Sequence, residues 1–460
     1  MIKVFSHWLH WRTIFQVVLD LLFPVVCMSL AALWIGQGGQ VELQTVVMYA
    51  VIFALTMIVL NAWLGFYQHS SSRTLAQTRA RAVLSLYLAV PLAYAVFSVL
   101  SIAEVSREML LLSGLAALFG TLAHRVYVAH SRSGSMLVHR VLIFGAGVEA
   151  ESVGNVLRKS DPDIQIVGFY PSPTDTEICL PAQVVLSREM SLSDTAHALK
   201  VNEIIIAVRE RRGGILPLRE LLDCKLSGVK VLDLASYFER ALGQIRLDSL
   251  RVGWLIFGEG FRQGWLRTAV KRLFDIVAAS ILLVLALPVM AVTALLIVIE
   301  DGFPVFYRQE RVGLNGRLFK VIKFRSMRND AESDGKPRWA TANDDRVTRV
   351  GRIIRKLRID ELPQLYSVLA GDMSLVGPRP ERPYFVDQLT RDIPFFAVRH
   401  SVKPGVTGWA QVSYHYGASV DDSVQKLQYD LYYVKNHTLF LDLVILFETV
   451  GVVLTGKGAQ

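Results

Sequence analysis

Long apolar runs near the N-terminus constrain this chain more than any other feature of its sequence. Four such runs occupy residues 14–35, 46–67, 83–101 and 109–129. Each is close to the roughly 20 residues that a helix needs to cross the hydrocarbon core of a bilayer. The first run is too long for the core of a signal peptide and lacks a convincing small-residue cleavage site. We therefore expect residues 1–132 to form four transmembrane helices.

The composition agrees with a membrane protein. Of the 460 residues, 52% are hydrophobic and 19% are charged, whereas soluble domains are about 45–50% apolar and about 25% charged. Cys27, Cys179 and Cys224 are far apart and form no CxxC pair, so we interpret them as reduced packing residues. The histidines show neither HxxxH nor HExxH spacing, which argues against a zinc site.

The charges of the connecting loops predict the orientation of these helices. The loops 36–45 and 102–108 are mainly acidic. Basic residues lie before the first run, between the second and third, and at the end of the fourth or after it: Lys3, Arg12, Arg73, Arg79, Arg81, Arg125, Arg132 and Arg140. By the positive-inside rule, both ends of this region face the cytoplasm, and so does everything after about residue 130.

A fifth apolar run, residues 276–299, predicts a different relation to the membrane. Lys271 precedes it, and a basic cluster that begins at Arg308 follows it. A straight crossing would place that cluster outside the cell, against the positive-inside rule. Pro288 lies in the middle, where it removes a helix hydrogen bond and bends the axis. We expect residues 271–300 to form a re-entrant membrane helix, with a plain fifth crossing as the alternative.

Residues 139–240 predict a small Rossmann-like α/β domain. The segment 140–144 (RVLIF) is typical of a buried strand, and the G-x-G-x-x-A turn of residues 145–150 opens a helix after it. Strands alternating with helices favour a parallel sheet. Residues 241–270 are expected to be a linker. Further strands are expected in four segments: residues 164–170, 183–186, 203–208 and 230–234.

The glycine turn leaves two interpretations open. Such a turn can bring backbone N–H groups and a helix N-terminus to a phosphate. However, the acidic residue that would bind a ribose about 20 residues further on is missing. Phe169, Tyr170, Pro171 and Ser172 stand there instead. We therefore favour a structural or regulatory role over nucleotide binding.

A basic stripe leads into two adjacent carboxylates, Asp360 and Glu361. Pro363 suits the first turn of a following helix, which is expected to end near Ala370, before Gly371. The carboxylates are then expected where two helices meet, beside a positive helix N-terminus. The stripe consists of arginines at every third position of a predicted helix: Arg349, Arg352, Arg355 and Arg358.

Paired acids among arginines suit phosphoryl transfer. An ionised carboxylate can attack phosphorus and form an acyl phosphate, and its neighbour can help to hold Mg²⁺. Arginines stabilise charge on the transferring phosphoryl oxygens. The alternative is an exposed cluster of salt bridges with no catalytic role.

Six segments of the C-terminal block, residues 271–460, together resemble the bacterial sugar transferase family. This family comprises polyprenyl-phosphate phosphoglycosyl transferases, and the leading helices and α/β domain are similar to its longer form. The segments are KRLFD (271–275), FKVIKFRSM (319–327), IDELPQ (359–364), GDMSLVGPRP (371–380), KPGVTGWAQV (403–412) and DLYYVKN (430–436).

The resemblance implies roles for individual residues. Asp360 matches a nucleophile that takes the phospho-sugar and releases UMP, and Glu361 matches its partner in supporting Mg²⁺. Pro288 matches a helix-breaking proline, although Leu287 replaces the Ser often found before it. An arginine contact to the donor does not carry over to residues 413–417, where SYHYG replaces a common Asn-Gly-Arg. The basic residues expected near the phosphates are Lys323, Arg325, Arg355 and Arg379.

The fold class expected from these observations is an α-helical membrane domain, a Rossmann-like α/β domain and a mostly helical catalytic domain with a re-entrant helix. The resemblance implies transfer of a sugar 1-phosphate from a UDP-sugar, with UDP-glucose favoured, to undecaprenyl phosphate. This would be the first membrane step of exopolysaccharide, capsule or O-antigen synthesis. The enzyme would lie in the bacterial inner membrane, contact membrane lipids but no nucleic acid, and be compatible with a homodimer.

Two other functional classes are weaker. A membrane nucleotide-sugar dehydratase or epimerase would need a Tyr-x-x-x-Lys pair, and the sequence contains none. A non-catalytic membrane scaffold would tolerate loss of the two carboxylates or of Arg379, and all three are present.

Overall fold

The computed structural model divides into two compact units, one holding most of the chain up to Leu242 and the other the chain from Gly243 to Gln460. The structure describes residues 2–4, 7–9, 11–35, 43–63, 139–160, 164–208 with short gaps, 216–247, 260–261, 264–328, 346–414 and 419–455, together with single positions between 85 and 120 and at 250.

Two apolar helices follow a pair of three-residue strands, β1 (Ile2–Val4) and β2 (His7–Leu9). Helices α1 (Trp11–Ile35) and α2 (Leu43–Trp63) pack against each other and cover the first two predicted runs. The third and fourth runs lie largely outside the described residues, so four crossings stay a prediction. Among the described helices only Trp265–Asp301 has the length and hydropathy of a membrane span, because the apolar stretches Thr13–Cys27 and Val47–Asn61 are shorter.

A chain of polar side chains connects these helices. Asn61 on α2 donates from Nδ2 to Oδ2 of Asp20 on α1 over 3.1 Å, and Ser85 donates from Oγ to Oδ1 of Asn61 over 2.7 Å. All three residues are buried. In apolar surroundings a polar side chain is stable only with such partners, so Asp20 faces neighbouring helices rather than lipid.

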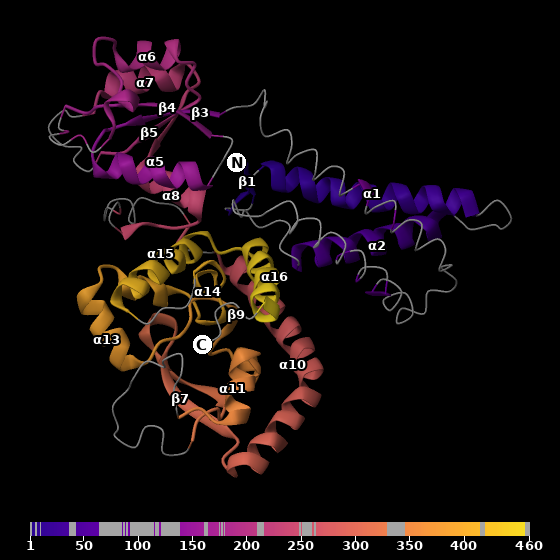
Figure 1. The fold of residues 1–460 in the computed structure, drawn as a ribbon. Coiled ribbons are helices and arrows are strands. Elements are labelled where there is room, and N and C mark those ends of the chain that lie inside the picture. The colour runs from indigo at the N-terminus through magenta and orange to yellow at the C-terminus, as the bar shows by residue number, and fades with distance from the viewer. Residues whose placement is uncertain are drawn as a thin grey trace. The chain divides into compact units, whose positions relative to one another are not determined.

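The α/β domain is a four-stranded parallel sheet in the order β4-β3-β5-β6. Its strands are β3 (His139–Phe144), β4 (Ile164–Tyr170), β5 (Glu203–Ile206) and β6 (Lys230–Asp233). Helices cover both faces (Figure 1), and they are α5 (Val148–Ser160), α6 (Leu192–Ala198), α7 (Leu218–Leu226) and α8 (Leu234–Leu242).

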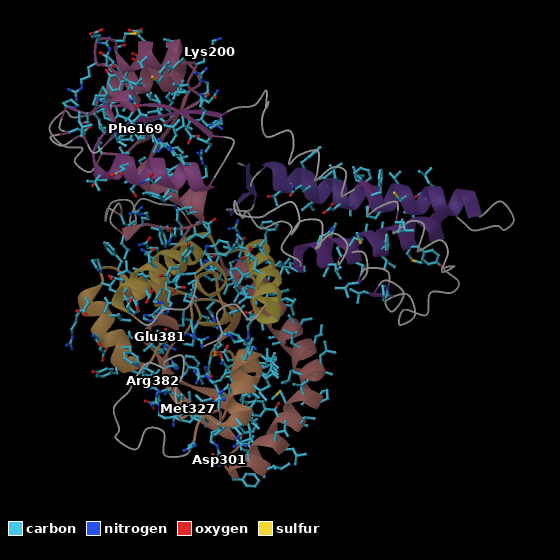
Figure 2. All side chains as sticks on the ribbon, viewed as in Figure 1. Phe169, Lys200, Asp301, Met327, Glu381 and Arg382 are labelled. Atoms are coloured by element: carbon cyan, nitrogen blue, oxygen red, sulfur yellow. The ribbon has the colours of Figure 1, made fainter. Side chains whose placement is uncertain are left out.

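Alternate residues of β3 supply the cores on the two faces of this sheet. Val141 and Ile143 pack with α5 and α8, whereas Leu142 and Phe144 pack with α6 and α7. Phe169 of β4, labelled in Figure 2, is fully buried in the first of these cores. The predicted parallel α/β sheet is confirmed.

The strand expected at residues 183–186 is wrong. A 3-10 turn, η2 (Ala182–Val184), begins after Pro181, whose fixed φ of −58° suits such a turn. The chain then meets β4 at one isolated bridge, between Val185 and Phe169. A short apolar run of this kind is compatible with a strand or with a turn, and Pro181 favours the turn.

The glycine turn of this domain is occupied by the chain's own carboxylate. Oδ2 of Asp175 accepts the backbone N–H groups of Ala146 and Ser172, each over 2.7 Å. The first turn of α5 adds Glu149 and Glu151. Since the anion position is taken and further negative charge lies beside it, the geometry supports the structural interpretation of the turn.

The second unit begins with residues that the sequence assigned to a linker. Gly243 accepts a hydrogen bond from Nε1 of Trp409 over 2.8 Å, and the N–H of Ile245 donates to the carbonyl of Gln428 over 3.0 Å. The Ile245 side chain is fully buried in the core of this unit. The described residues 243–247 are therefore part of the catalytic unit, and a linker starting at 241 is wrong for them.

The long helix α10 (Trp265–Asp301) runs continuously through Pro288. Figure 1 shows it as a curved ribbon along one side of the second unit. Most of its central side chains are exposed apolar residues, such as Val284, Leu285 and Val292. The predicted apolar helix with an internal proline is confirmed. The helix does not break at Pro288 but continues through it as one curved element.

Both ends of α10 are attached to the same unit. Near its start, Arg272 donates to the carbonyls of Val368 and Leu369 over 2.6 and 2.8 Å. At its end, the Glu300 carboxylate accepts the N–H groups of Arg349 and Val350 over 2.7 and 2.8 Å. A straight helix of this length would span about 55 Å and carry its ends to opposite faces of a bilayer. The attachments support the predicted return to one side.

The rest of the second unit is mostly helical, as predicted. An antiparallel hairpin of β7 (Phe306–Val312) and β8 (Leu318–Phe324) follows α10, and β9 (Ser374–Val376) pairs in parallel with β10 (Gly405–Thr407). The other elements are η4 (Leu314–Gly316), α11 (Arg349–Lys356), η5 (Ile359–Glu361), α12 (Gln364–Ala370), α13 (Pro383–Asp392), η6 (Phe396–Ser401), α14 (Trp409–Ser413), α15 (Val420–Asn436) and α16 (Leu439–Thr455).

Candidate active site

Asp360 and Glu361 lie in η5, between the helices α11 and α12. Arg358 adopts a left-handed conformation with φ of 58°, which ends the helical course of the chain before η5. Helix α12 then starts after Pro363 and ends at Ala370, before Gly371, whose φ of 96° suits glycine. The predicted boundaries of this helix are confirmed.

Both carboxylates are buried, with only 8% of Asp360 and 7% of Glu361 exposed. Ionisable side chains are almost never buried to this degree unless they are paired or functional. An exposed cluster of salt bridges, the alternative interpretation of this pair, does not describe these residues.

Glu361 is surrounded by three cations, two from other elements of the unit and one, Arg358, from the residues just before it. Its Oε1 lies 2.7 Å from Arg379 NH2, 3.4 Å from Lys323 Nζ and 3.6 Å from Arg358 NH1. Within the described part of the chain, the Asp360 side chain has no hydrogen bond or ion pair of its own. The neighbouring carboxylates thus differ: one is held in place, and the other is available to react.

Burial and these cations push the two pKa values apart. Burial, and then the negative charge of Glu361, raise the pKa of Asp360 to about 6. Burial also tends to raise the pKa of Glu361, but Arg379, Lys323 and Arg358 outweigh it and hold that pKa well below its usual range. One carboxylate of the pair therefore stays ionised at all ordinary pH values, and the other becomes ionised near neutrality.

Lys323 and Arg379, both predicted near the phosphates, lie at the dyad. Lys323 is on β8, directly opposite Tyr307 of β7. Burial lowers the pKa of Lys323, whereas the charge of Glu361 raises it. Arg379 lies in the segment after β9, which leads to Glu381 and Arg382 (Figure 2).

The other two predicted basic residues are placed differently. Arg325 donates from NH2 to the carbonyls of Asp301 and Gly302 over 2.9 and 2.7 Å. Its buried guanidinium thus stabilises the C-terminal end of α10, where helix carbonyls lack partners, and these contacts do not bring it to the dyad. Arg355 lies in the last turn of α11, shortly before the dyad, and its role stays a prediction.

The arginine stripe is only partly on one helix. Arg349, Arg352 and Arg355 belong to α11, and the first two are exposed. Arg358 lies beyond the helix end and is the member whose distance to Glu361 is short. Of the loop 413–417, Tyr414 donates to Asp422 Oδ1 over 2.8 Å, and residues 415–417 lie outside the described residues.

Some residues that support the site had no signal in the sequence. Arg399 and Arg311 are charged residues turned inward, and no spacing distinguishes them from surface arginines. Asp430 stands in a segment that carries the family resemblance, but the sequence does not show that its partner is Arg399, 2.8 Å away. These contacts join residues far apart in the chain, so only the fold reveals them.

Comparisons with known proteins agree with this geometry. The model of the family described as bacterial sugar transferase matches residues 266–456. Over 242 residues the chain is 46% identical to a UDP-N-acetylgalactosamine-undecaprenyl-phosphate N-acetylgalactosaminephosphotransferase of Aeromonas hydrophila, a match that covers 53% of this chain and 56% of that protein. The chain thus spans about half the length of this relative.

Two further relatives are named for glucose. A UDP-glucose:undecaprenyl-phosphate glucose-1-phosphate transferase of Xanthomonas campestris pv. campestris is 31% identical over 347 residues, which cover 73% of this chain and 70% of that protein. One of Caulobacter vibrioides is 44% identical over 193 residues, covering 41% and 71%. The Xanthomonas match extends well beyond the catalytic unit.

Proposed function

This chain belongs to the bacterial sugar transferase family, and we propose that it transfers a sugar 1-phosphate from a UDP-sugar to undecaprenyl phosphate. The observation that carries the proposal is the buried dyad of Asp360 and Glu361, with Lys323 and Arg379 directed at Glu361. The relatives named above act on undecaprenyl phosphate, which gives the acceptor.

In the first step, the Asp360 carboxylate attacks the phosphorus that bears the sugar. An oxygen–phosphorus bond forms to Asp360, the bond to the bridging oxygen of the diphosphate breaks, and UMP leaves with that electron pair. A covalent aspartyl-phosphate sugar remains on the enzyme. In the second step, a phosphate oxygen of undecaprenyl phosphate attacks the same phosphorus and releases Asp360 as a carboxylate.

Glu361 and its cations prepare the site for this chemistry. Arg379 and Lys323 place positive charge where negative charge is redistributed during transfer, in surroundings that exclude much of the water. The ionised Glu361 orients these cations and keeps them close to Asp360. Its own negative charge raises the pKa of Asp360 and makes that carboxylate a stronger nucleophile once ionised.

The dyad also fits Mg²⁺, the cofactor that the family resemblance implies. Mg²⁺ is usually bound by one or two protein carboxylates together with substrate phosphates, and Asp360 and Glu361 are adjacent. Within the described residues no group of three or more His, Cys, Asp or Glu could hold a metal. Mg²⁺ held by Asp360 and Glu361 would neutralise the diphosphate and the departing UMP.

For the sugar itself we propose two candidates, glucose and N-acetylgalactosamine. The sequence favours UDP-glucose, and the relatives divide between glucose and N-acetylgalactosamine. Both donors therefore belong in the test.

The test is release of UMP by the purified full-length enzyme in detergent with Mg²⁺ and undecaprenyl phosphate. UDP-glucose and UDP-N-acetylgalactosamine are supplied separately, with UDP-galactose and UDP-N-acetylglucosamine beside them. We expect UMP release with one donor and a lipid-linked sugar as the second product. Release of UDP in place of UMP would mean that the sugar leaves without its phosphate, and the proposed reaction would be wrong.

A further inference from the structure

The segment that carries Arg379 is held through its backbone rather than through its side chain. Residues 377–381 (GPRPE) lie between β9 and α13, outside any regular element. The Arg379 side chain reaches Glu361 over 2.7 Å and is itself 32% exposed. Its position therefore depends on what fixes the backbone beneath it.

Several backbone groups of this segment are hydrogen-bonded to neighbouring elements. The Gly377 N–H donates to the Thr407 carbonyl over 2.9 Å, and the Pro378 carbonyl accepts from the Gly405 N–H over 3.0 Å. These two bonds join the segment to β10. The carbonyl of Glu381 accepts from the Val312 N–H at the end of β7 over 3.0 Å.

The two central carbonyls are bound by arginine side chains instead. Arg311 donates from NH1 to the Pro380 carbonyl over 3.0 Å. Arg399 donates from NH2 to the carbonyl of Arg379 itself over 2.9 Å. Among the described hydrogen bonds, no backbone N–H donates to the Arg379 carbonyl, so Arg399 is its described donor.

Arg399 is held by a buried carboxylate. Its NH2 lies 2.8 Å from Oδ2 of Asp430 on α15, and the side chains are 7% and 3% exposed. The Phe396 ring lies under the guanidinium, 5.1 Å from its carbon to the ring centroid. Asp430 is followed along α15 by Leu431 and Tyr432, which are fully buried in the core of the unit. The pair is thus attached to the buried core of the unit.

We infer that the Arg399–Asp430 ion pair is a positioning device for the transferase reaction, which fixes Arg379 against Glu361 through the Arg379 carbonyl. The inference rests on the proposed function. None of the described contacts of Arg399 and Asp430 is with Asp360. They act through Arg379, and their contribution depends on it.

A positioning role would explain why this ion pair is buried, because buried pairs are often no more stabilising than apolar residues of similar volume. What an apolar pair cannot supply is a donor for the Arg379 carbonyl. Stability and catalysis are therefore expected to separate when the pair is replaced. A displacement of about 1 Å at a catalytic group can lower the rate by about 100-fold.

The test uses the full-length enzyme and UMP release. Arg399→Lys keeps a positive charge for Asp430 but loses the planar guanidinium whose NH2 nitrogen contacts both the Arg379 carbonyl and Asp430. We expect kcat to fall by about 10-fold to 100-fold with little change in KM. In an Arg379→Lys background the same substitution should have no further effect. The control is Arg240→Lys, which alters the buried Arg240–Glu203 pair of the α/β domain.

The second variant separates positioning from folding. In the double variant Arg399→Met and Asp430→Leu, the melting temperature should stay within a few degrees of the wild-type value while kcat remains low. If kcat returns together with stability, or if the effects of Arg399→Lys and Arg379→Lys on kcat multiply, the positioning role is wrong.

Hydrogen exchange provides a readout that does not need activity. In Arg399→Lys, peptides covering residues 374–382 should exchange faster, while peptides from the core of α15 stay protected. Unchanged exchange at 374–382 would overturn the inference. A wild-type enzyme that releases no UMP from any donor would instead remove the proposed function, and the exchange result would still decide whether Arg399 holds this segment.

Discussion

At the scale of single residues, the site separates two neighbouring carboxylates by their surroundings. Glu361 has three cations within 3.6 Å, and Asp360 has no direct partner among the described residues. A pair whose environments push its pKa values apart is typical of acid–base and nucleophilic sites. The arrangement assigns reaction to Asp360 and electrostatic support to Glu361.

The raised pKa of Asp360 predicts the acid limit of activity. A nucleophilic carboxylate must be ionised, so activity is lost as pH falls through its pKa, here about 6. The ratio kcat/KM should therefore rise between about pH 5 and pH 7 and then level off. In Lys323→Met this acid limb of the kcat/KM profile should move to higher pH, because the positive charge of Lys323 lowers the pKa of Asp360 in the wild-type enzyme. A limb near pH 4 in both enzymes would contradict the role given to Asp360.

Replacing Glu361 by Gln should lower kcat by a factor on the order of 100 or more, as loss of a charge-stabilising group in a closed site does. The amide keeps the shape of the side chain but cannot neutralise Arg379, Lys323 and Arg358. UMP release measures the effect. The control is Asp387→Asn, an exposed residue of α13. Equal activities of the two variants would mean that Glu361 is only a structural residue.

At the scale of secondary-structure elements, the glycine turn of residues 145–150 shows that a motif can predict the local structure without showing which of its glycines is required. The spacing of residues 145–150 predicted a strand–turn–helix, and β3 and α5 confirm it. The spacing does not tell which glycine is required. Gly145 has φ of 122°, and a Cβ there would lie 2.8 Å from the Ala207 carbonyl oxygen, whereas the nearest atom to a Cβ on Gly147 is 3.8 Å away.

This difference gives a matched pair of variants. Gly145→Ala should lower the free energy of unfolding by more than about 1 kcal/mol, because the backbone conformation and the space are both unfavourable. Gly147→Ala should leave the melting temperature nearly unchanged, and UMP release by the folded fraction should stay normal in both. A nucleotide copurifying in stoichiometric amount, or an inactive but stable Gly147→Ala, would show that the turn binds a ligand.

Elements with strong periodic signals could be predicted from the sequence, and elements decided by distant contacts could not. The apolar course of α10 and the limits of α12, with Pro363 before it and Gly371 after it, follow from local residue preferences. The place of residues 243–247 in the catalytic core depends on Trp409 and Gln428, far away in the chain. The contacts of Arg325 with the carbonyls of Asp301 and Gly302 were likewise not visible in the sequence, and its expected place near the phosphates stays a prediction.

At the scale of the whole molecule, the central expectation is that α10 enters and leaves the membrane on one side. Single cysteines at Arg267 and Arg308, both exposed, lie on either side of its apolar stretch. In spheroplasts of a strain producing a chain without its natural cysteines, a membrane-impermeant thiol reagent should label neither. A cysteine at position 40, in a loop predicted to face outward, should be labelled. Labelling at Arg308 alone would mean a straight crossing.

The covalent step is the claim on which the rest depends, and one measurement tests it most directly. Full-length enzyme is incubated with its UDP-sugar and Mg²⁺ but without lipid acceptor, and its intact mass is determined. We predict a mass increase of one sugar phosphate, located on Asp360 by peptide mapping and removed by undecaprenyl phosphate. Asp360→Asn should show neither the adduct nor turnover. A fully active Asp360→Asn enzyme would contradict the account.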